Sequence, residues 1–99
     1  MTKIKNMIDD LKEEIEGAKC YAEKALESKV KSSPRYSKYK TMAEQELEHA
    51  SIIHDFLVED INELEKVYPQ IPENMKEGWD KAHKEYIEKV AWIKMMLSM

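Results

Sequence analysis

Apolar residues recur at helical spacing along three segments of the chain, and two short proline-containing stretches separate these segments. The separating stretches read SSP (residues 32–34) and PQIP (residues 69–72). Proline lacks a backbone N–H and cannot continue a helix that comes before it. The pattern therefore predicts an all-α fold with three helices, over residues 3–30, 34–68 and 73–98.

The first two predicted helices each carry one apolar stripe, which is typical of helices that pack on one side. In the first helix the stripe consists of Ile4, Met7, Ile8, Leu11, Ile15, Ala18, Ala22, Ala25 and Leu26. In the second it consists of Tyr39, Met42, Ala43, Ala50, Ile53, Leu57, Ile61 and Leu64. Thr2 can cap the first helix and Ser33 the second, with Pro34 in its first position. We expect these helices to form an antiparallel hairpin.

The third predicted helix has two apolar groups on different faces. Its main stripe contains Trp79, His83, Tyr86, Ile87, Val90, Ile93, Lys94 and Leu97. The second group contains Trp92, Met95 and Met96. Two interpretations remain open: the helix contacts more than its own chain, or these last residues form a frayed, partly exposed end.

Size and charge narrow the classes of protein. The 99 residues suit one domain, for which oligomerisation is a reasonable expectation. A net charge of −4 argues against nucleic-acid binding by bulk charge, and no apolar run approaches the roughly 18 residues that a membrane span needs.

Asp9 and Asp10 lie where a signal peptide would be apolar, so we expect a cytoplasmic protein. The single cysteine, Cys20, excludes an internal disulfide framework.

A glutamate interrupts the apolar stripe of the second helix, and a histidine lies one turn further on at the edge of the same face. At 100° per residue, Glu46 lies about 20° from Tyr39 and about 40° from Ala50. A carboxylate in that position must be protonated, paired or bound to a cation, because burying an unpaired charge costs several kcal/mol. His49 lies one turn further on, so the two side chains can reach a single divalent ion. A buried Glu–His pair is the alternative.

The first helix has a matching feature. Met7, Glu14 and Tyr21 are spaced by seven residues and share one edge of its apolar stripe. Glu14 can therefore point toward a neighbouring helix, or it can be an ordinary glutamate at the boundary of the stripe.

These residues make up half of a known kind of metal site. Ferritin-like carboxylate bundles take one glutamate from each of two helices and a Glu-x-x-His motif from each of the other two. This chain has one helix of each kind, so two copies related by a two-fold axis would complete a ferritin-like four-helix bundle.

Two stretches resemble the ferritin-like and rubrerythrin-like proteins. They read EIEGAKCY (residues 14–21) and MAEQELEHA (residues 42–50). The half-length arrangement is similar to that of the encapsulated ferritins, and the chain also resembles small uncharacterised helical proteins of prophages. The resemblance implies that Glu14, Glu46 and His49 are metal ligands and that Tyr21 lies near the site. It implies a di-iron site, with manganese or zinc as alternatives, in a homodimer or larger even homo-oligomer with a ferroxidase-like activity.

Other interpretations stay open. His83 can complete the metal site, or it can be a core histidine with one hydrogen bond, and we expect His54 to be structural or solvated. The competing function is a non-enzymatic, phage-type helical module that binds a copy of itself or another protein. In that case Glu46 and His49 form a buried pair that fixes the register of the helices. Glu14 discriminates the two functions, because only the metal site requires it.

Overall fold

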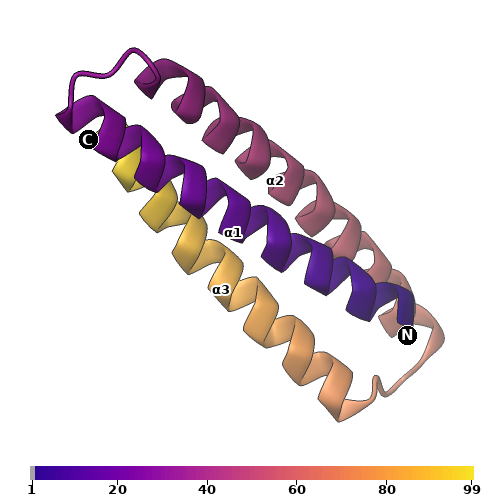
Figure 1. Ribbon diagram of the computed structural model, residues 1–99. Helices are drawn as coiled ribbons and strands as arrows, with labels where there is room; N and C mark the ends of the chain where they lie inside the picture. The colour runs from indigo at the N-terminus through magenta and orange to yellow at the C-terminus, as the bar shows by residue number, and fades with distance from the viewer. Residues whose placement is uncertain (1) are drawn as a thin grey trace.

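Three α-helices make up the computed structural model, which describes residues 2–99 and contains no strand among them (Figure 1). They are α1 (Thr2–Val30), α2 (Tyr36–Val67) and α3 (Glu73–Ser98). The predicted all-α class is confirmed, and each helix begins and ends within two residues of its predicted bounds. None of the helices within residues 2–99 combines the length and the apolar character that a membrane span requires.

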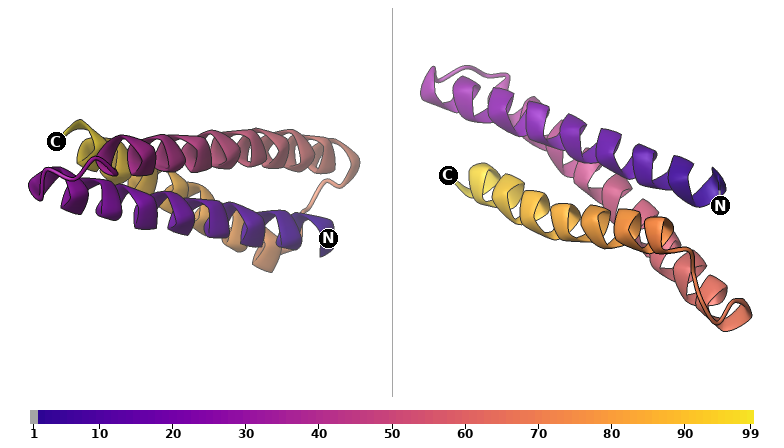
Figure 2. Two further views of the ribbon diagram at one scale, coloured as in Figure 1. Left: turned by 45° about the horizontal axis from the view of Figure 1, so that its top comes forward. Right: turned by 90° about the horizontal axis from the view of Figure 1, so that it is seen from below.

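The helices form an elongated rod with α1 in the middle, measuring 55 Å along its longest axis and 17 Å along the other two (Figure 1). α1 and α2 form the predicted antiparallel hairpin, and α3 returns along α1 in the same direction as α1. The two connecting loops lie at opposite ends of the rod (Figure 2). α3 packs on α1 and barely touches α2, so one side of the hairpin is left without a covering helix.

The loop between α1 and α2 is organised around Ser33. The chain leaves α1 through Ser32, whose φ of 55° lies in the left-handed region that often ends a helix. The Ser33 N–H then donates to the Ser28 carbonyl at 2.8 Å, and the Ser33 Oγ accepts from the Arg35 N–H at 3.2 Å. Ser33 therefore stabilises the turn before the helix, but the prediction that it caps α2 was wrong, because α2 begins at Tyr36 with Arg35 in the capping position and no side chain caps it. The predicted start at Pro34 is two residues early, because residues 34 and 35 form a turn before the regular helix.

The core lies mainly between α1 and α2. From α1 it takes Ile4, Ile8, Leu11, Ile15, Ala18, Ala22 and Ala25. From α2 it takes Ala43, Ala50, Leu57 and Ile61. All of these belong to the predicted stripes. The alanines on both helices have small side chains, which let the two backbones approach closely.

The buried face of α3 differs from the predicted one. Ala82, Ile93 and Met96 are buried, whereas Ile87 is 54% exposed and Lys94 is also exposed. The predicted stripe was wrong at Ile87 and Lys94 because α3 packs mainly on α1 and buries only a narrow face. Trp92 and Met95 are exposed as well, yet α3 continues to Ser98, so they lie on a formed helix and not on a frayed end.

Candidate metal centre

Glu14, Glu46 and His49 converge on the open side of the hairpin. One carboxylate oxygen of each glutamate and one ring nitrogen of His49 all lie within 4.8 Å of one another. The His49 Nδ1 is 3.6 Å from the Glu14 Oε2. Glu14 comes from α1 and the other two residues from facing turns of α2. The three residues that the sequence pattern grouped are therefore close enough to share one ion.

The register of α1 against α2 places Glu14 opposite Glu46. Tyr21 and Tyr39, each seven residues from these glutamates, stack with ring centroids 6.5 Å apart. The pairs Glu14–Glu46 and Tyr21–Tyr39 are seven residues apart on each helix. α1 and α2 therefore keep one antiparallel alignment over two turns. Tyr21 thus lies about 10 Å along the helix from Glu14, given a rise of 1.5 Å per residue, and its ring contacts Tyr39.

One oxygen of the Glu14 carboxylate, Oε2, is buried and has no hydrogen-bond donor among the described residues. The side chain as a whole is 29% exposed, and the neighbouring His49 side chain is 56% exposed. A buried carboxylate oxygen without a donor is costly, and a proton or a cation is what would stabilise it. Because His49 opens to the surface, a cation can reach this oxygen.

The Glu14 carboxyl group also affects the ionisation of Glu46. Glu14 raises the pKa of Glu46 above its ordinary value, first because a protonated Glu46 can donate a hydrogen bond to Glu14. Burial and the like charge of Glu14 raise the pKa of Glu46 further, while His49 lowers it. Without a cation, Glu46 therefore holds a proton that it can donate to Glu14 up to a higher pH than an ordinary glutamate does. A divalent ion would replace that proton and also use the imidazole nitrogen.

Gly17 provides the space that the Glu46 side chain occupies. A Cβ atom at residue 17 would lie 3.1 Å from the Glu46 Oε2 and 3.5 Å from its Cδ. The 3.1 Å contact is tighter than normal packing, so a Cβ atom at residue 17 would require the carboxylate to shift by a few tenths of an ångström. The glycine costs helix stability, and its position explains why α1 has one there.

His83 lies elsewhere, in a cluster that bridges α2 and α3. Its Nδ1 is 2.7 Å from the Nε2 of His54, and Trp79 and Tyr86 lie beside the two rings. His83 is not part of the group formed by Glu14, Glu46 and His49. Of the two sequence interpretations of His83, the hydrogen-bonded histidine fits this position, but its partner was not predicted. His54 is half-buried, and its contact with His83 joins α2 to α3.

Apolar side chains surround the candidate centre on the open side of the hairpin. Met42 and Phe56 lie seven residues before and after His49 on α2, and they are 37% and 51% exposed. Met7, Tyr21 and Ile53 are partly buried next to the core. The polar cluster therefore lies within a mixed apolar surface.

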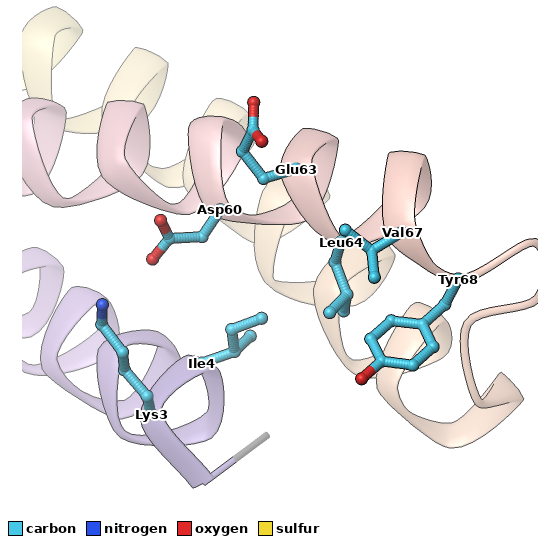
Figure 3. A pocket seen from close by; sticks show the side chains of 7 residues that line it. All are labelled: Lys3, Ile4, Asp60, Glu63, Leu64, Val67 and Tyr68. Atoms are coloured by element: carbon cyan, nitrogen blue, oxygen red, sulfur yellow. The ribbon is translucent and has the colours of Figure 1, made fainter.

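A separate groove lies near the end of the hairpin, with a volume of about 380 Å³ (Figure 3). Ile4 of α1 and Leu64 of α2 point toward one another across it, and Tyr68 closes one end. Its polar residues are Lys3, Asp60 and Glu63. With one lysine and two separate carboxylates, this groove lacks the convergence of ligand atoms seen at the candidate centre.

Fold and site together define a three-helix protein with a half-exposed carboxylate–imidazole cluster between two antiparallel helices. No protein-family model matches the chain, and neither curated proteins nor solved structures gave a match.

Proposed function

We propose that the protein is a metal-binding, ferritin-like half-bundle whose di-metal site is shared across a homodimer. The observation that carries the proposal is the convergence of Glu14, Glu46 and His49 within 4.8 Å, with a buried Glu14 oxygen that has no donor. One chain offers two carboxylates and one imidazole. A second copy would offer the same set and complete the pattern of carboxylate bundles, with one glutamate and one Glu-x-x-His motif from each hairpin.

The surroundings of the cluster support a second copy as the partner. α3 leaves this side of the hairpin uncovered, and Met42 and Phe56 are exposed at equal spacing on either side of His49. In a two-fold dimer the same surface meets itself, so an apolar patch centred on the cluster is self-complementary. Burying it would remove apolar area from water and would bring the two half-sites together. The result would be a four-helix bundle formed by two hairpins.

The donor set fits iron or manganese, and also zinc, because all three accept carboxylate and imidazole ligands. We favour iron and a ferroxidase-like reaction, in which the bound metal pair would supply the electrons for reduction of O₂. The residues of the chain would hold the ligand geometry. Glu14 and Glu46 would contribute carboxylates, His49 would contribute its ring nitrogen, and Gly17 would leave room for Glu46.

The competing function is a helical interaction module in which the cluster is only structural. A pair that fixes register needs Glu46 and His49 alone, and a third acidic group beside them would weaken it by repulsion. The position of Glu14 next to both residues therefore supports the metal site over the interaction module.

Metal content per chain, measured on protein purified without chelator and without a nickel column, tests the proposal. We expect about one iron or manganese per chain, in a dimer or larger even assembly by light scattering. Glu14→Gln should lose the metal and keep the helical content, because Gln retains the shape of the side chain. Glu48→Gln is the matched control, since Glu48 is exposed on the same turn of α2.

Two results would contradict the proposal. One is a stable, metal-free oligomer that takes up no added Fe(II). The other is a Glu14→Gln variant with the same metal content as the unmodified protein. Either result would return Glu46 and His49 to a structural role and would favour a protein partner.

A further inference from the structure

His54 of α2 and His83 of α3 meet through a direct ring-to-ring hydrogen bond. The Nε2 of His54 and the Nδ1 of His83 are 2.7 Å apart, while the ring centroids are 4.9 Å apart and the planes differ by 19°. Because the centroid distance is much longer than the N···N distance, the rings meet edge to edge. One nitrogen therefore carries the hydrogen and the other presents its lone pair.

This pair is the centre of the small contact between α2 and α3. Tyr86 stacks on His54 with centroids 4.1 Å apart and planes 11° apart. The ring centroid of Trp79 lies 5.6 Å from that of His54 and 5.3 Å from that of His83. The four rings thus join α3 to α2, while α3 packs mainly on α1.

The number of protons on the pair decides whether this bond can exist. With both rings neutral, one N–H donates to the other ring. A first added proton can go to the outer nitrogen of the donor ring, and the bond survives as an imidazolium–imidazole pair. A second proton must go to the accepting nitrogen, which leaves two N–H groups and two positive charges facing each other. The bond is then lost.

The groups around His54 oppose its protonation more than they favour it. Burial lowers the pKa of His54, and His83 lowers it further, while Asp55 on α2 raises it. On α3 the charged residues of the adjoining turns are Asp80, Lys84 and Glu85. α1 contributes apolar core residues, and its Asp9 and Lys12 line a surface groove with Lys81 of α3.

We propose that the His54–His83 pair is an acid-sensitive switch, in which uptake of the second proton separates α3 from α2 while α3 stays on α1. Separation exposes Trp79 and Tyr86. The switch is independent of the proposed metal function, because neither histidine belongs to the Glu14–Glu46–His49 cluster.

The fluorescence of Trp79 reports the separation directly. We would titrate a Trp92→Phe variant, so that Trp79 is the single tryptophan, from neutral to acidic pH in the presence of a chelator. NMR of the imidazole nitrogens would follow the protonation of each histidine. We expect the Trp79 emission to shift to longer wavelength in the second protonation step, with the helical circular dichroism retained.

His83→Gln in the same background is the matched variant, because glutamine can hydrogen-bond to His54 and does not titrate. Its Trp79 emission should stay constant over that pH range, and His54→Gln should behave in the same way if the first variant folds poorly. The proposal is overturned if both rings become protonated with no shift in emission. It is also overturned if the glutamine variants show the same shift, or if all three helices unfold in the same step.

Discussion

Gly17 of α1 faces the carboxylate of Glu46 of α2 so closely that a Cβ atom at residue 17 would come within 3.1 Å of the Glu46 Oε2. A glycine in the middle of a 29-residue helix lowers the stability of that helix. Here it lets a carboxylate lie between two helices beside Glu14 and His49. Local stability and the geometry of the cluster therefore have opposite requirements at residue 17.

Replacing Gly17 with alanine should separate these two requirements. We expect Gly17→Ala to stabilise the metal-free protein by up to about 1 kcal/mol, because alanine favours the helix. The same change should lower metal affinity, because the Glu46 carboxylate must move away from α1. Urea unfolding in chelator and metal titration by calorimetry would measure the two effects.

Gly78→Ala is the control for that experiment. A Cβ atom at residue 78 of α3 would meet no atom within 4 Å. The substitution should give a similar gain in stability with no change in metal affinity. Equal metal affinity in both alanine variants would contradict the role assigned to Gly17.

The raised pKa of Glu46 predicts how the metal-free protein responds to pH. Folded Glu46 keeps its proton at pH values where the unfolded chain, with an ordinary pKa of 4.5, has lost it. Its contribution to stability is therefore complete below pH 4.5 and disappears as pH rises through the folded pKa. Glu46→Gln, which can donate to Glu14 at any pH, should be more stable than the unmodified protein at pH 7 and closer to it at pH 5.

Urea unfolding at the two pH values and at equal protein concentration tests this prediction. His54 acts in the opposite direction: its lowered pKa removes stability as pH falls below the ordinary histidine value of 6.5. The difference between Glu46→Gln and the unmodified protein cancels that effect, because both keep His54. Glu48→Gln should show no pH-dependent difference, and an equal gain from both variants would argue against a proton held by Glu46.

The apolar side chains around the cluster predict a specific effect on assembly. Phe56→Ser should weaken the homodimer and lower its metal content, with little effect on the fold of the hairpin, because Phe56 is 51% exposed. Sedimentation velocity across a range of concentrations would measure the dissociation. Ile87→Ser on α3, at a residue that is 54% exposed, should leave the dimer unchanged. A dimer that tolerates the first change and not the second would place the interface on α3.

Tyr21 provides a test of the chemistry beyond metal binding. Tyr21→Phe keeps the ring that stacks on Tyr39 and removes the hydroxyl group. We expect metal content to stay the same and the rate of Fe(II) oxidation by O₂ to fall, measured by stopped-flow absorbance. Tyr39→Phe is the matched control on the partner ring. Unchanged oxidation rates in both variants would remove Tyr21 from the proposed reaction.

Sequence spacing was sufficient for the helices, because they depend on local repeats, whereas the meeting of Glu14 with Glu46 and His49 also depends on the register of α1 against α2. Proline residues separate the three helices, and the seven-residue spacing of Met7, Glu14 and Tyr21 placed Glu14 on the edge that faces α2. The buried face of α3 was predicted less well. Whether Ile87 is buried depends on which helix α3 packs against, and the repeat within α3 does not contain that information.

The contact between His54 and His83 could not be predicted for a related reason. The two residues are 29 positions apart and lie on different helices, so their meeting depends on the path of the loop over residues 68–72 and on the rotation of α3. His83 lies within the predicted stripe of α3, but His54 lies outside the predicted stripe of α2, so nothing in the sequence pattern pairs the two residues.

α1 lies between α2 and α3 and separates the outer face of α3 from the candidate metal centre between α1 and α2. Because α2 and α3 lie against α1 and hardly touch each other, substitutions on the outer face of α3 can accumulate without disturbing Glu14, Glu46 or His49. Trp92 and Met95 lie on α3, away from the core. The outer face of α3 can therefore change its surface properties while α1 and α2 keep the Glu14–Glu46–His49 cluster together.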